Sequence, residues 1–102
     1  MATVEVRING RVYPCRMTMG AMLRYRRLTG KEVSEMEGGS VSELATLLYC
    51  CTASACSADG VEFGLELDEF CDLIGPEDME RMSAGIRTEE SGDDGSKKKP
   101  RG

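Results

Sequence analysis

Residue types that could catalyse a reaction are scarce in this chain. It has no His among its 102 residues, so the side chain most often used to move protons is missing. Acid–base and nucleophilic catalysis both need a group that titrates near neutral pH and a neighbour that activates it. Glu66, Asp68 and Glu69 could bring two carboxylates together, but the solvated start of a helix explains this run better. We therefore expect no enzymatic activity and no catalytic residue.

Patterns that bind ligands are equally weak. Gly38 and Gly39 have neither the spacing nor the flanking lysine of a phosphate-binding loop. The run from Asp59 to Glu62 lacks the ladder of Asp and Asn residues that precedes the corresponding part of a calcium loop. We expect no cofactor.

The cysteines favour a reduced protein core. There are five, an odd number, with no C-x-x-C pair: Cys15, Cys50, Cys51, Cys56 and Cys71. Secreted disulfide frameworks normally have an even count, and zinc sites favour closely spaced Cys and His pairs. Cys51 and Cys71 fall on the apolar faces of predicted helices, where a free Cys acts as a small hydrophobic residue. We expect buried thiols and no metal site.

Composition and length predict one small soluble domain. At 102 residues a second core would not fit, and seven Met with five Cys replace the usual Trp and Phe. The first residues do not form a basic and apolar export signal. The longest apolar run, residues 44–56, is shorter than the ~20 residues of a membrane span. We expect a soluble protein that stays in the compartment where it is made, with no membrane partner.

The charges are distributed unevenly. Residues 1–31 carry seven bases and one acid, whereas residues 32–80 carry thirteen acids and no base. One cluster of bases surrounds Tyr25 and is typical of a helix that binds phosphates: Arg24, Arg26, Arg27 and Lys31. The acidic middle would repel phosphates, and residues 28–40 are too long for the turn of a helix-turn-helix. We expect no nucleic-acid partner, although a nucleic-acid-binding regulator that uses this basic helix stays an alternative.

The first elements are predicted to be a β-hairpin and a helix. Val4, Val6 and Ile8 alternate with polar residues, and Asn9-Gly10 is the preferred pair for a tight type I′ turn. A second strand follows over residues 11–16, where a proline indicates a sheet edge. A helix is then expected from the Thr18 N-cap to about residue 28, with a glycine at position 30 ending it.

This first helix is predicted to have two apolar faces. One stripe consists of Ala21, Met22, Tyr25 and Leu28. The other side carries Met19 and Leu23 beside Arg26 and Arg27. A core this small can cover only one face fully, although a helix wedged between the hairpin and the other helices would bury both. We select Met19, Leu23, Arg26 and Arg27 as the candidate partner-binding residues.

The rest of the chain predicts more helices and a tail. Ser40 and Glu43 match a capping box before a helix that ends near residue 56 or 57. Its expected apolar face consists of Val41, Leu44, Ala45, Leu48, Cys51, Thr52 and Ala55. A third helix is expected over residues 68–74, and Pro76 is suited to start a further turn. The expected fold is α+β: a hairpin packed on three to four helices in residues 1–85, followed by a disordered polar tail in residues 86–102.

The order of these segments resembles a known family. The hairpin with Asn9-Gly10, the segment around Tyr25, the Thr29-Gly30-Lys31 run and the helix behind Ser42-Glu43 follow one another as in the tail assembly chaperones of long-tailed phages and prophages. The resemblance covers residues 4–84 and lies in the order of these segments.

The resemblance implies a function in phage assembly. Such chaperones bind the tape-measure protein in the cytoplasm of the bacterial host, keep it soluble and hand it to the tail-tube protein. They are absent from the finished particle. A minor structural protein of the tail is a further alternative, and a homo-oligomer is compatible with the sequence. A Met-rich helix surface suits this role because Met side chains adapt to different partners.

Overall fold

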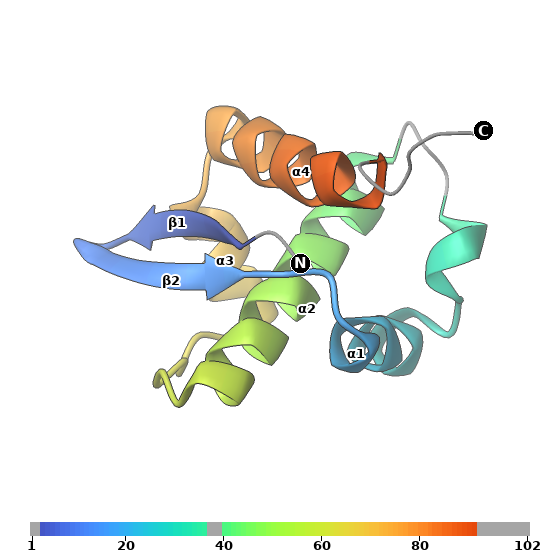
Figure 1. Cartoon of the computed structure of the whole chain (residues 1–102), viewed down its shortest axis with the longest axis horizontal. Helices are drawn as coiled ribbons and strands as arrows, with labels where there is room; N and C mark the ends of the chain where they lie inside the picture. Colours follow the sequence, from blue (N-terminus) through green and yellow to red (C-terminus); the bar gives the residue numbers. More distant parts are fainter. Residues whose placement is uncertain (1–2, 37–39, 92–102) are drawn as a thin grey trace.

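The computed structural model describes residues 3–36 and 40–91, with side chains described up to residue 86. It contains a two-stranded antiparallel sheet followed by four α-helices, as Figure 1 shows. The elements in chain order are β1 (Val4–Ile8), β2 (Arg11–Cys15), α1 (Met19–Thr29), the 3₁₀ turn η1 (Val33–Glu35), α2 (Val41–Asp59), α3 (Leu67–Leu73) and α4 (Pro76–Ser91). The predicted α+β class is confirmed.

The hairpin forms as its sequence predicts. Asn9 and Gly10 both have positive φ, at 54° and 80°, which is the geometry of a type I′ turn. This turn sets the register, so that Val4 lies opposite Cys15 and Ile8 opposite Arg11. One face of the sheet is buried, through Val6, Ile8, Tyr13 and Cys15. The second strand ends one residue earlier than predicted.

Helix α2 is the centre of the molecule. The Ser40 hydroxyl accepts a hydrogen bond from the Glu43 amide at 3.2 Å, and Gly60 ends the helix in a left-handed conformation. The prediction of a single apolar face was too narrow, because β2, α1, α3 and α4 all contact this helix. Its buried residues are Leu47, Leu48, Cys50, Cys51, Thr52, Ser54, Ala55 and Cys56. Val41, predicted on the inner face, is 68% exposed because it lies at the helix start.

The domain boundary was predicted at residue 85. Helix α4 runs past it to Ser91, and Ile86 is buried at 4% exposure. Gly85 makes this possible, because an added Cβ there would lie 2.0 Å from Val4 Cγ2. The glycine therefore lets α4 pack closely on β1, and the ordered domain continues beyond it. The remainder of the predicted tail, residues 92–102, lies outside the described residues.

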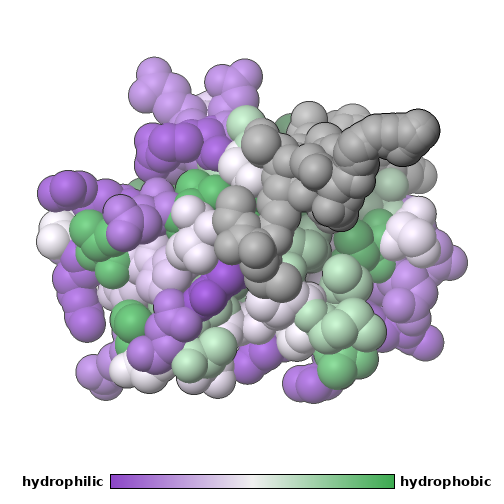
Figure 2. Space-filling model, in the orientation of Figure 1, coloured by the Kyte–Doolittle hydropathy of each residue, from purple (hydrophilic) through white to green (hydrophobic). Residues whose placement is uncertain are grey.

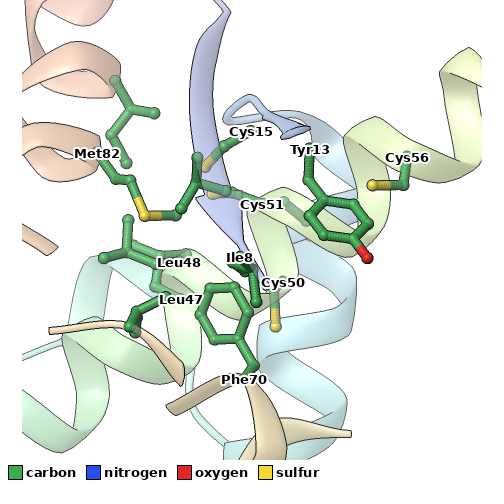
Figure 3. Close-up of a cluster of buried hydrophobic side chains, with 14 of the residues drawn as sticks. Ile8, Tyr13, Cys15, Leu47, Leu48, Cys50, Cys51, Cys56, Phe70 and Met82 are labelled. Atoms are coloured by element: carbon green, nitrogen blue, oxygen red, sulfur yellow. The ribbon is translucent and has the colours of Figure 1, made fainter. Parts of the chain in front are cut away.

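The core is rich in sulfur. Cys15, Cys50, Cys51 and Cys56 are buried thiols, and Met82 is fully buried with them in the same cluster. Figure 3 shows these side chains, which come from β2, α2 and α4, spread through the same cluster as Tyr13 and Phe70. Small thiols let several elements approach α2 closely, which compensates for the shortage of large aromatic residues.

Helix α2 is also, within the described residues, the one helix long and apolar enough to cross a membrane by length and composition. Half of its most apolar window is buried inside the protein. A central core helix has this same composition because its neighbours cover it on several sides.

Candidate partner-binding surface

Helix α1 is fixed at both ends by local signals that the sequence contains. The Thr18 hydroxyl accepts a hydrogen bond from the Ala21 amide at 3.0 Å. At the other end, Gly30 adopts φ 79° and donates its N–H to the Arg26 carbonyl at 2.8 Å. These caps satisfy backbone groups that a short helix would otherwise leave to water. The helix is therefore a well-defined platform for the side chains on its surface.

The first turn of α1 is held close to α2. The hydroxyls of Thr18 and Ser54 form a hydrogen bond between the two segments. A Cβ added to Gly20 would lie 2.9 Å from Ser54 Oγ, so the glycine lets the two helices approach closely at this point. The close approach fixes which side of α1 faces the core and which side faces outward.

The inner face of α1 is narrow. Ala21 and Tyr25 are both fully buried, and burial followed by the charge of Glu43 raises the pKa of Tyr25. Met22 is half-buried. Leu28, which we predicted on this stripe, is 54% exposed and borders a shallow cavity of about 250 Å³ between α1 and α2. It lies in the last turn of α1, where Tyr49 and Ala53 of α2 border the same cavity without covering it.

The outer face of α1 carries the four candidate residues. Met19 is 70% exposed and Leu23 is 55% exposed, and Arg26 and Arg27 are exposed beside them. At 100° per residue these four side chains fall within roughly one quadrant of the helix. Figure 2 shows hydrophobic side chains over the end of α1 that faces the viewer, next to hydrophilic ones. The structure thus places all four residues together, away from the core.

Ion pairs hold part of the basic cluster. Arg26 donates from Nε to Glu32 Oε2 at 3.1 Å and from Nη1 to the Gly30 carbonyl at 2.9 Å. Lys31 forms an ion pair with Glu43 at the start of α2. These pairs tie the end of α1 to the η1 segment and to α2. They also lower the positive charge that the helix presents to a ligand.

Other surfaces were missed by the sequence reasoning. An apolar groove of about 340 Å³ lies between the start of α2 and α4, bordered by Val41, Leu44 and Met79. Val41 and Leu44 had both been predicted on the inner face of their helix. The signal was present in Val41, which follows the Ser40 cap directly: a first-turn residue extends beyond the neighbouring elements that would cover it.

A further groove of about 470 Å³ runs between the outer side of the hairpin and α4. Glu5, Arg7, Asp78 and Arg81 give it charges of both signs, and Arg81 already forms an ion pair with Asp78 at 3.0 Å. Charges that neutralise each other in this way do not select an anion or a cation. We assign no ligand to this groove.

Comparison with models of known protein families, with curated proteins and with solved structures finds no match to this chain.

Proposed function

We propose that this protein is a non-enzymatic tail assembly chaperone that binds and solubilises a phage tape-measure protein through the outer face of α1. The observation that supports this most is the exposure of Met19 and Leu23, at 70% and 55%, on a helix that is capped and packed on its other side. Apolar side chains that gather on a rigid surface, with charged neighbours, are typical of protein-binding sites. The resemblance noted in the sequence supplies the identity of the partner.

The chemistry of this face fits a helical client. Met19 and Leu23 are four residues apart and form one apolar strip, with Arg26 and Arg27 at its edge. Such a strip can pack against the apolar side of another helix while the guanidinium group of Arg27 pairs with acids that flank it. The flexible Met side chain would let the same surface accept successive, non-identical segments of a long client.

The nucleic-acid alternative is less well supported. Two of the four bases in its cluster, Arg26 and Lys31, are paired with Glu32 and Glu43. A phosphate backbone would have to compete with these carboxylates for the same cations. We expect no measurable binding of an arbitrary duplex near physiological salt. Tight binding that weakens steeply with added salt would favour the regulator instead.

Co-expression with the tape-measure protein tests the proposal. The variant Met19→Ser/Leu23→Ser should fold, because both residues lie outside the core, but it should leave the tape-measure protein insoluble. The matched control is Val12→Ser/Leu28→Ser, which removes two apolar side chains that are 46% and 54% exposed on other surfaces. If the first variant folds and still solubilises its client, or if the control fails equally, the outer face of α1 is not the binding site.

The alternative of a minor structural tail protein is tested separately. A chaperone leaves before assembly is complete, whereas a structural subunit stays in the particle. Mass spectrometry of purified particles should therefore find the tape-measure protein and no stoichiometric amount of this chain. Its presence at a fixed copy number would favour the structural role.

A further inference from the structure

The groove between α2 and α4 is a second apolar surface, made of residues that do not belong to the outer face of α1. Val41 is 68% exposed at the start of α2, and Leu44 and Met79 are half-buried below it. Pro76 closes the groove at the start of α4. Helix α4 crosses the first turns of α2 in Figure 1, and the two helices are in contact. The groove thus has rigid helical walls and an apolar floor.

A second apolar hollow adjoins the groove. Leu44 and Ser83 also border a neighbouring hollow of about 270 Å³, which Met17, Leu47 and Ile86 help to line. The two hollows therefore adjoin at Leu44 and Ser83. A groove between two helices accommodates the apolar stripe of a third helix, which inserts side chains one or two turns apart.

The charged residues that the structure describes at the rim of this groove are acidic. Glu77 and Glu80 are exposed along its rim, and the described residues that line the groove include no base. The sequence explains this, because residues 32–80 contain thirteen acids and no Lys or Arg. Arg81, the first base after this stretch, is paired with Asp78 and lines the separate groove beside the hairpin. The rim is therefore complementary to a cationic ligand.

We propose that this groove binds an amphipathic helix whose apolar stripe is flanked by Lys or Arg. The floor supplies the apolar contact, and the two rim carboxylates select the flanking charge. This is the opposite preference to that of α1, where Arg26 and Arg27 flank the apolar strip. The groove site does not depend on the role proposed for α1, and the protein would hold two helical segments of different charge at once.

Two labelled peptides serve as probes. Both have about 18 residues, or roughly five helical turns, with the same Leu stripe. One carries Lys on each side of the stripe and the other carries Glu. Fluorescence anisotropy with the full chain should show that the Lys-flanked peptide binds to the groove and that added salt weakens its binding. If the Lys-flanked peptide binds to the variant Glu77→Lys/Glu80→Lys as tightly as to the wild type, the proposal is overturned.

The rim variant and its control make the test specific. Glu77→Lys/Glu80→Lys should weaken binding of the Lys-flanked peptide by about tenfold, from the loss of two attractive pairs and the gain of two repulsive ones. Asp68→Lys/Asp72→Lys changes the net charge equally, at exposed positions on α3, and should change binding less than about twofold. Equal effects from both variants would mean that only the overall charge matters, and the groove proposal would fail.

A second pair of variants separates the two surfaces. Val41→Ser removes an exposed apolar side chain from the groove and should weaken the binding of the Lys-flanked peptide. This variant keeps the test valid if the charge-reversed variant folds poorly. Met19→Ser/Leu23→Ser should leave the binding of the Lys-flanked peptide unchanged and weaken the binding of the Glu-flanked peptide. If the α1 variant instead abolishes binding of the Lys-flanked peptide, that peptide docks on α1 and the groove is not its site.

Discussion

Helices α1 and α2 both carry apolar residues, but the core buries them to different extents. Eight of the 19 residues of α2 are buried, whereas α1 buries two of its 11. Helix α2 is contacted by β2, α1, α3 and α4, but α1 packs mainly on α2 and on the short η1 turn. A helix with neighbours on several sides has its apolar residues covered. A helix with one main neighbour keeps a second face exposed.

The largest expected effect separates the two helices directly. Leu48 in α2 is fully buried, and Leu48→Ala should lower the free energy of unfolding by about 3 kcal/mol because it removes transfer energy and leaves a cavity. Leu23→Ala makes the same chemical change at a side chain that is 55% exposed, and should cost less than about 0.5 kcal/mol. Urea unfolding of both variants measures the difference. Equal losses would show that the outer face of α1 is part of the core.

Glycine substitutions compare how closely α4 and α1 approach their neighbours. Gly85→Ala would place a Cβ 2.0 Å from Val4 Cγ2, and should destabilise the protein by about 1–3 kcal/mol despite the better helix propensity of Ala. Gly20→Ala meets a hydroxyl at 2.9 Å and should cost less, because the Ser54 side chain can rotate. The double variant Val4→Ala/Gly85→Ala should recover part of the loss. Thermal unfolding that shows no loss for Gly85→Ala would contradict the close contact between α4 and β1.

A smaller effect depends on pH and reports on the α2 core. Burial raises the pKa of Cys50 from 9.0 to about 11. Above pH 9 the unfolded chain releases this proton while the folded protein retains it, so rising pH favours unfolding. Stability should be insensitive to this thiol below pH 9 and should fall between pH 9 and pH 11. The Tm of Cys50→Ala should decline less steeply across that window than the Tm of the wild type, and parallel curves would exclude Cys50 as a cause.

The smallest effect concerns the end of α1. Arg26→Ala removes an exposed ion pair with Glu32 and a hydrogen bond to the Gly30 carbonyl. Such pairs contribute about 0.2–1 kcal/mol, and salt screens them. The loss of stability should therefore be smaller in high salt than in low salt. A loss of several kcal/mol would show that Arg26 supports the fold, and its use as a binding residue would need to be reconsidered.

Local signals predicted the start and end of most elements. Asn9-Gly10 specified the hairpin because both residues tolerate positive φ, and the side chains of Thr18 and Ser40 specified helix starts because each accepts a backbone hydrogen bond. The four candidate residues on the outer face of α1 were also grouped correctly by helical spacing. The errors at Leu28 and Val41 have one cause: periodicity gives the face of a helix, but it does not show how far the neighbouring elements extend along it.

The sequence by itself determined which segments are strands and helices, which helix is most apolar and where the charges lie, since these depend on residues close together in the chain. Only the tertiary structure decided that α2 is covered on several sides, that α4 continues past Gly85, and that an acid-rimmed groove lies between them. These features depend on contacts between distant residues, such as Gly85 against Val4. Composition predicted a disordered tail from residue 86, but Ile86 is buried in the core. Because Gly85 has no side chain, α4 can pack directly against Val4 of the hairpin.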